Sequence, residues 1–409
     1  MNAIMRKLFV ALFMVLAGLG FAQTELQIKV DVVYLSSDLL LGRETGTEGE
    51  SLAAEYLAER FEQIGLKPAG TDGYFQPFTF EERPNPHAAN PITEARTVRG
   101  KNVVGYLDKG SDRTIVIGAH YDHLGFGHTG SLYTGEPAIH NGADDNASGV
   151  GALLYLAAKL AADPSLEENV LIISFSGEEY GLFGSKYFVA NPTIPLDKVS
   201  YMLNMDMVGR LNNENVIVVN GAGTSPVWKD LLEQVKGGLT VQTTDSGVGP
   251  SDHTSFYLED MPVLHFFTGQ HTDYHKPSDD SQLINYDGIQ EVADFMFRII
   301  KALDDQPKLA FTKTKDDSGK KASSFKVTLG VMPDYTYTAG DGMRIDGVLA
   351  DRPAEKGGML KGDVIIKLGD MEVKDIYGYM DALAKFNSGE KAIVEFIRDG
   401  KKQTAEIVF

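Results

Sequence analysis

Histidines and carboxylates gather in the middle of this 409-residue chain, at spacings that suit a metal site. Eight of the nine histidines lie between His120 and His275. Because the chain has no cysteine, imidazole and carboxylate would have to hold any metal, and these donors suit zinc or a similar divalent ion. The residues stand in five motifs: Gly118-Ala119-His120-Tyr121-Asp122, Asn141-Gly142-Ala143-Asp144-Asp145-Asn146, Ser176-Gly177-Glu178-Glu179, Asn204-Met205-Asp206-Met207 and Tyr274-His275-Lys276-Pro277.

Three of these motifs come directly after apolar runs of strand length. His120, the pair Glu178-Glu179 and Asp206 each follow such a run. Sites in open α/β sheets gather at the carboxyl ends of the strands, so residues far apart in the chain can converge there. Each motif alone is weak, since a His beside an Asp is usually an ordinary hydrogen-bonded pair. Their joint occurrence at strand ends favours a metal site.

Two histidines and several acids are more ligands than a single three-ligand site needs. A carboxylate that bridges two ions about 3.5–4 Å apart would use them economically. Such an ion pair polarises a carbonyl and lowers the pKa of a bound water molecule, and a carboxylate outside the coordination sphere can take the proton. The adjacent Glu178 and Glu179 can divide these duties, one as the base and one as a ligand.

The elements that would position these residues alternate between strands and helices. Thr47 and Glu50 form a capping box for a helix that Gly65 ends. Strand-like runs are predicted at residues 102–106, 114–119, 170–174, 200–205, 215–219 and 262–267, and helices at 147–162, 226–235 and 286–303. This alternation predicts an α/β domain with a largely parallel sheet.

The charge and the cysteine content of the chain exclude several kinds of binding partner and site. The chain has 38 basic and 57 acidic residues, a formal net charge of −19. Such an acidic surface repels phosphate backbones, so we expect no nucleic-acid partner. The absence of cysteine excludes disulfides, thiolate nucleophiles and a lipid-modified N-terminal cysteine.

Residues 1–22 resemble a secretory signal peptide. Arg6-Lys7 precede an apolar stretch from Leu8 to Leu19, which is too short to span a bilayer comfortably, and small residues stand before Gln23. An uncleaved membrane anchor is the alternative. We expect export to the periplasm or the medium, without a stable membrane anchor.

The composition changes again after the last predicted helix. Residues 304–323 are rich in Lys and Asp and poor in apolar residues, as in a linker. Short strands, glycine turns and two modest helices are predicted over residues 324–409. The domains expected are therefore a catalytic domain over residues 23–303, a linker over 304–323 and a second domain over 324–409.

Together, the five motifs resemble the co-catalytic zinc aminopeptidases of the bacterial leucyl aminopeptidase and aminopeptidase Y type, which are related to glutaminyl cyclases and glutamate carboxypeptidases. The resemblance runs from about Asp38 to Leu303 and includes Gly42-Arg43 upstream. It implies a three-layer α/β sandwich around a mostly parallel, mixed central sheet.

The resemblance also implies roles for the motif residues. His120 and Asp206 would bind one zinc ion, Glu179 and His275 the other, and Asp144 would bridge them. Glu178 would be the general base, and Asp122 would orient His120. Asp145 would not itself be a ligand. A cis peptide bond between Asp144 and Asp145 is common in this family. Two Zn²⁺ per chain are expected, with Co²⁺ or Mn²⁺ as alternative metals.

The remaining histidines have weaker assignments. Asp252 and His253 resemble a family motif that lines the substrate pocket, although a turn-stabilising pair is an equal alternative. His265 is expected to be a core residue with its hydrogen bonds satisfied, and His87 and His271 are unassigned. Loop positions are expected for His123, His128 and His140.

The C-terminal region resembles a PDZ domain. Leu329-Gly330-Val331 is similar to the loop that captures a peptide carboxylate, and residues 362–368 match the strand signature that follows the short helix. Met332-Pro333 departs from the usual apolar strand. The domain is therefore expected either to bind a peptide C-terminus or to make an intramolecular contact.

The resemblance indicates an exported two-zinc aminopeptidase that acts on peptides with a free N-terminus, through a metal-activated water and a glutamate base. One alternative is a glutaminyl cyclase on the same scaffold. The other is a non-catalytic peptide-binding protein, although such proteins would be expected to have lost ligands that this chain retains.

Overall fold

The computed structural model describes residues 26–82, 95–133, 135–314, 327–333, 340–348, 352–374 and 376–409. The predicted signal peptide, residues 1–22, and residues 315–323 of the predicted linker lie outside these ranges. Within them, no helix combines the length and the apolar character needed to cross a bilayer.

The catalytic region is built on a mixed sheet that has nine strands in the described part of the chain. Its strand order is β1-β3-β5-β4-β6-β9-β7-β8, and β2 also pairs with β3. The strands are β1 (Lys67–Pro68), β2 (Phe75–Glu82), β3 (Arg96–Leu107), β4 (Thr114–His120), β5 (Asn169–Phe175), β6 (Val199–Met205), β7 (Val216–Asn220), β8 (Thr240–Thr243) and β9 (Val263–Phe267).

Four neighbouring strands, β5, β4, β6 and β9, run parallel and form the centre of the sheet. Strands β3 and β7 run antiparallel to the flanks of this group. Every residue of β4, β5 and β6 is buried, because helices cover both faces of the sheet. The parallel centre brings the carboxyl ends of β4, β5 and β6 to one edge.

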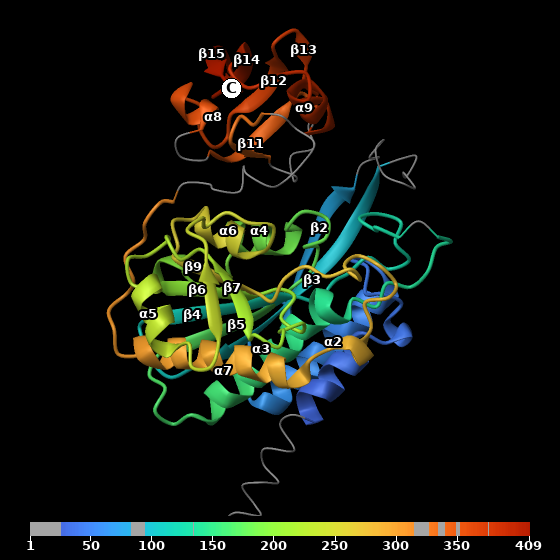
Figure 1. The fold of residues 1–409 in the computed structure, drawn as a ribbon, viewed down its shortest axis with the longest axis vertical. Coiled ribbons are helices and arrows are strands. Elements are labelled where there is room, and N and C mark those ends of the chain that lie inside the picture. Colours follow the sequence, from blue (N-terminus) through green and yellow to red (C-terminus); the bar gives the residue numbers. More distant parts are fainter. Residues whose placement is uncertain are drawn as a thin grey trace, which may run out of the picture.

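The helices form two layers around this sheet (Figure 1). One face is covered by residues 26–35 and by α2 (Glu48–Ile64), α3 (Gly149–Ala162) and α7 (Tyr286–Leu303). The other face is covered by α4 (Phe183–Ala190) and α6 (His253–Tyr257), while α5 (Trp228–Val235) packs near α7. Short helical turns are η1 (Asp38–Leu40), η2 (Ala143–Ser148), η3 (Leu196–Lys198) and η4 (Ser281–Leu283).

The capping signals that the sequence carries around α2 act as expected. The Thr47 side chain accepts a hydrogen bond from the Glu50 backbone amide at 3.4 Å. Gly65 ends the helix in the left-handed conformation, with φ +91°. Ala53, Leu57 and Phe61 are buried on the face that packs on the sheet.

The C-terminal domain has its own sheet and its own apolar core. The antiparallel strand order is β10-β11-β12-β14-β15, with β13 beside β12. The elements are β10 (Val331–Pro333), β11 (Met343–Val348), α8 (Pro353–Lys356), β12 (Val364–Leu368), β13 (Met371–Glu372), α9 (Ile376–Leu383), β14 (Lys391–Arg398) and β15 (Lys401–Val408). Lys361 pairs with Glu259 of the catalytic region at 3.1 Å.

Candidate metal centre

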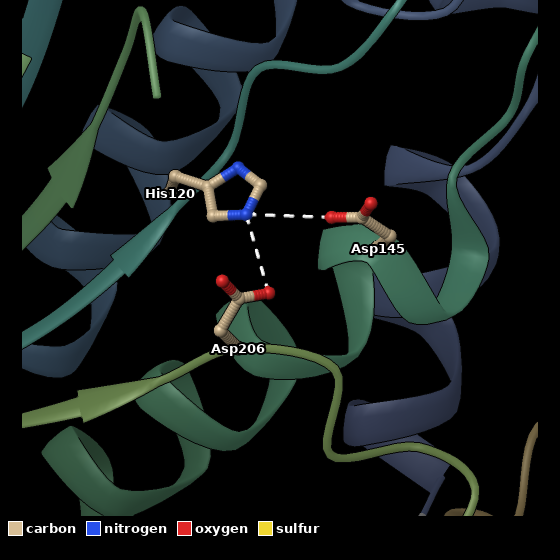
Figure 2. Close-up of side chains that lie close together, drawn as sticks. All are labelled: His120, Asp145 and Asp206. Carbon is tan, nitrogen blue, oxygen red and sulfur yellow. Dashed lines mark hydrogen bonds and ion pairs between the residues drawn. The ribbon is translucent and has the colours of Figure 1, made fainter. Parts of the chain in front are cut away.

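His120, Asp206 and Asp145 come together at the carboxyl edge of the parallel strands (Figure 2). His120 is the last residue of β4, and Asp206 directly follows β6. His120 Nε2 lies 3.4 Å from Asp145 Oδ1 and 3.4 Å from Asp206 Oδ1. These three side chains therefore present one nitrogen and two oxygen donors to a common point.

A second group of donors lies on the other side of Asp145. His275 Nε2 is 3.2 Å from Asp145 Oδ2 and 3.3 Å from Glu179 Oε2. His123 Nδ1 is 2.7 Å from Glu179 Oε1. The two oxygens of one carboxylate, that of Asp145, thus face two different histidines, His120 and His275.

The structure places Asp145, rather than the predicted Asp144, between the two groups of donors. The Asp144 carboxylate turns away from the cluster, because it accepts hydrogen bonds from the Gly209 amide at 2.6 Å and the Ser148 hydroxyl at 2.9 Å. Its other oxygen lies 3.1 Å from His271 Nε2. Neighbouring side chains on a bent segment point in different directions, and only Asp145 points between the two histidines. The non-proline cis peptide is at Asp145–Asn146, not between the two aspartates.

The loop that carries these aspartates is held by a third one. Asp279, which is fully buried, accepts hydrogen bonds from the backbone amides of Asp144 at 2.8 Å and Asp145 at 3.0 Å through the same oxygen. Its other oxygen contacts Arg210 at 3.2 Å. Asp279 follows His275 by four residues, so it ties two ligand-bearing loops together.

Glu178 lies beside the donor groups but outside both of them. Its carboxylate is 4.0 Å from His120 Nε2. The backbone amide of Glu178 donates to Asp122 Oδ1 at 3.2 Å, and the Thr45 hydroxyl donates to Asp122 Oδ2 at 3.0 Å. Since Asp122 also approaches His120 Nδ1 at 3.7 Å, it connects the base candidate with a donor histidine.

The glycine-rich loop after β4 sets the orientation of His275. The Gly130 carbonyl accepts a hydrogen bond from His275 Nδ1 at 2.8 Å, and the His275 carbonyl accepts one from the Leu132 amide at 3.0 Å. With Nδ1 donating to a carbonyl, the imidazole presents Nε2 to Asp145 and Glu179. Fixing the tautomer through the second nitrogen is typical of histidines that bind metals.

Electrostatics in the cluster follow from the excess of carboxylates. Burial lowers the pKa of His120, but Glu178 and Asp206 outweigh this effect and hold the pKa well above its usual range. Burial likewise opposes the charge on His275, yet Glu179 raises its pKa to about 11. The acids therefore draw positive charge onto both histidines, which is the field expected of a cation site.

Glu178 behaves differently from the neighbouring acids. Burial raises the pKa of Glu178 well above its usual range, against the lowering effect of His120. Asp252 shows the same direction, because burial raises its pKa to about 7. Carboxyl groups whose pKa is raised toward neutrality suit proton transfer at the pH of most enzymes.

The donor set fits zinc. The donor atoms of His120, Asp145 and Asp206 lie within 4.8 Å of one another, and those of His123, Asp145 and Glu179 do too. Imidazole nitrogens and carboxylate oxygens are regular zinc ligands when no thiolate is present. These residues are almost completely buried around a shared carboxylate, so two neighbouring ions can be held by one set of side chains.

His123 lies in a loop, as expected, but its place beside the donor groups was not predicted. It is fully buried and contacts Glu179. Its position three residues after His120 was the available signal. The other two histidines that were expected in loops are His128, which is exposed, and His140, whose ring hydrogen-bonds to the Ser131 hydroxyl and the Ala138 carbonyl.

The predicted pocket residues Asp252 and His253 lie in the layer that covers β6 and β9. Both are buried, and their side-chain oxygens and nitrogens have no hydrogen-bond partner. His253 stacks on His265, with ring centroids 4.6 Å apart. His265 donates or accepts only through Nδ1, toward Asn220 at 3.1 Å, so its predicted full satisfaction is wrong.

Comparison with known proteins finds two domain families that parts of the chain match. Residues 102–300 match the profile of peptidase family M28, and residues 311–408 match a PDZ domain. The probable lipoprotein aminopeptidase LpqL of Mycobacterium tuberculosis is 26% identical over 211 residues, which cover 47% of this chain and 39% of the relative. The chain thus spans about two fifths of the length of the first curated relatives.

Solved structures share the fold of the catalytic region. The LapA aminopeptidase of Legionella pneumophila superposes with a TM-score of 0.52 at 21% identity, covering 69% of this chain and 71% of LapA. The glutaminyl cyclase of Porphyromonas gingivalis reaches 0.55 at 18% identity, covering 68% and 98%. These likenesses and the layered model confirm the predicted α/β sandwich. The chain therefore matches peptidase family M28 over residues 102–300, followed by a match to a PDZ domain over residues 311–408.

Proposed function

We propose that this chain is an exported, zinc-dependent aminopeptidase with two zinc ions per chain. One observation carries the proposal: the two oxygens of Asp145 face His120 on one side and His275 on the other, at 3.4 and 3.2 Å. A carboxylate in this position can bridge two ions. The relatives named as aminopeptidases support the class of reaction, with peptides that have a free N-terminus as substrates.

In this proposal His120, Asp206 and Asp145 hold one ion. His275, Glu179 and Asp145 hold the other, with His123 bonded to Glu179. Zinc in these positions would polarise the scissile carbonyl and lower the pKa of a water molecule to about 7. Asp145 takes the bridging role expected for Asp144.

Glu178 then moves the proton. Its carboxylate lies at the rim of the donor groups, so it can accept a proton from the attacking water and deliver it to the leaving amine. Asp122 contacts both the Glu178 backbone amide and the His120 ring, so it fixes the position of the base relative to that histidine. Asp252 and His253 remain candidates for the substrate pocket.

The proposed domains are a catalytic domain over residues 23–303, a linker over 304–323 and a PDZ domain over 324–409. The PDZ domain would bind either a peptide C-terminus or another part of the same chain.

A glutaminyl cyclase is the second candidate, because one of the matching folds is a glutaminyl cyclase. Cyclisation needs no hydrolytic water, whereas the paired donor groups around Asp145 offer places for two ions. The test compares release of amino acids from aminoacyl-anilides with ring closure of a peptide that begins with glutamine. Hydrolysis is the expected result, and cyclisation without hydrolysis would overturn the main proposal.

Changing Asp122 to Asn is expected to lower kcat/KM by about 10- to 100-fold while the protein stays folded. Thr45 and Glu178 donate to different oxygens of the Asp122 carboxylate, so in Asn the NH2 group would face one of these donors and lose that hydrogen bond. Asp287→Asn, on the exposed start of α7, is the matched control and should leave kcat/KM unchanged. An Asp122→Asn enzyme with unchanged kcat/KM would contradict the orienting role.

A further inference from the structure

Arg43 is a fully buried arginine whose hydrogen bonds go to backbone carbonyls. Its guanidinium donates to the Tyr121 carbonyl at 2.8 Å, the Asn141 carbonyl at 2.7 Å and the Gly142 carbonyl at 3.0 Å. It also donates to the carbonyl of Leu35. A planar fork with five N–H groups can bind several carbonyls at once, which an ammonium group cannot reproduce.

The carbonyls of Tyr121, Asn141 and Gly142 stand at the two ends of the segment that joins β4 to η2, next to residues of the proposed metal site. Tyr121 directly follows His120, while Asn141 and Gly142 precede Asp145 by three to four residues. These two ends are about twenty positions apart, and no helix or strand lies between them in the described residues 121–133 and 135–142, so the intervening backbone does not by itself set their distance. The guanidinium joins them directly.

The backbone around Arg43 is shaped to place it there. Leu41, Gly42 and Arg43 all have positive φ angles, of 49°, 74° and 49°, which is uncommon for residues with a side chain. A Cβ on Gly42 would lie 2.6 Å from the Gly125 carbonyl oxygen, so the turn packs tightly against the glycine-rich loop. The Arg43 carbonyl accepts from the His123 amide at 3.2 Å. A conformation this restricted persists only where its surroundings enforce it.

We propose that Arg43 is a positioning residue that sets the distance between His120 and Asp145, and thereby the geometry and affinity of the metal centre. The inference rests on the proposed function. Burial lowers the pKa of Arg43 to about 10, so the side chain keeps its charge at neutral pH. All five N–H donors of the guanidinium are therefore present at neutral pH.

The test is Arg43→Lys, which keeps the charge and removes the fork. We expect zinc affinity, measured by competition with a chelator, to fall by about 10- to 100-fold, and the visible spectrum of the cobalt-loaded protein to change because the donor geometry changes. Arg113→Lys is the matched control. Arg113 pairs with buried Glu168 before β4 and β5, at the opposite edge of the sheet, and its substitution should lower stability without altering either metal readout.

Each alternative role for Arg43 predicts a different combination of zinc affinity, cobalt spectrum and stability. Unchanged zinc affinity and cobalt spectrum in Arg43→Lys, with lower stability only, would overturn the inference. If only the charge mattered, Arg43→Lys would match the wild type and Arg43→Gln would bind zinc more tightly, which would also overturn it. A wild-type protein that binds no zinc would instead refute the proposed function.

A second variant covers the case in which Arg43→Lys does not fold. Arg43→Ala, refolded with millimolar guanidinium, is expected to regain part of its zinc affinity because the added ion can occupy the vacated position. Guanidinium should have no such effect on Arg113→Ala. Failure of guanidinium to restore zinc binding in folded Arg43→Ala would contradict the positioning role.

Discussion

Glutamine in place of Glu178 is expected to lower turnover by about 10²- to 10⁴-fold while both zinc ions stay bound. The side chain lies outside both donor groups, so losing its charge removes a proton acceptor and leaves the ligands intact. The backbone amide of residue 178 still donates to Asp122, which keeps the loop in place. Turnover of an aminoacyl-anilide and zinc content by metal analysis measure the two quantities.

The neighbouring position provides the comparison. Glu179 contacts His275 at 3.3 Å and His123 at 2.7 Å, so Glu179→Gln is expected to lose zinc and turnover together. The two variants would then distinguish the base, Glu178, from the metal ligand, Glu179. If Glu178→Gln lost zinc while Glu179→Gln retained it, the assigned roles would have to be exchanged.

Asn at position 145 is expected to reduce zinc affinity more than any other single change, whereas Asn at position 144 should leave zinc bound. Asp145 serves both donor groups, so neutralising it weakens both ions. Asp144 instead accepts hydrogen bonds from Gly209 and Ser148 and contacts His271. Its replacement leaves one of these buried contacts mismatched, which costs about 1–3 kcal/mol in the free energy of unfolding.

Two measurements check these two variants: the zinc that remains after dialysis and the midpoint of urea unfolding. Asp145→Asn should show a large loss of zinc, and Asp144→Asn should show a lower unfolding midpoint with zinc retained. The opposite pattern would restore Asp144 as the bridging residue, the assignment that the motif alone favours.

Much of the fold could be predicted from local patterns. The apolar runs before His120, Glu178 and Asp206 are strands β4, β5 and β6, and the Thr47 and Gly65 signals bound α2 where expected. Strands β1 and β8 and helices α4 and α6 were not predicted. Their segments are short or mixed in polarity, and they are stabilised by packing on the sheet rather than by their own periodicity.

The candidate site was predictable as a set of motifs but not as a geometry. Position at strand ends predicts that His120, Glu179 and Asp206 meet at one edge of the sheet. In the structure His120 approaches Asp206, and His275, which follows no strand, approaches Glu179. Periodicity could not distinguish Asp144 from Asp145, because adjacent acids on an irregular turn have no pattern that fixes their directions. Nor could it show that His123 turns inward to Glu179.

The sequence by itself determined the donor chemistry, since a chain without cysteine offers only imidazole and carboxylate to zinc. It also determined the α/β order that carries those donors to one edge of a sheet. Only the tertiary structure decided which aspartate stands between the histidines. Asp279 accepts hydrogen bonds from the backbone amides of Asp144 and Asp145, and Arg43 donates to the carbonyls of Asn141 and Gly142. Such bonds between residues distant in the chain exist only once the chain has folded.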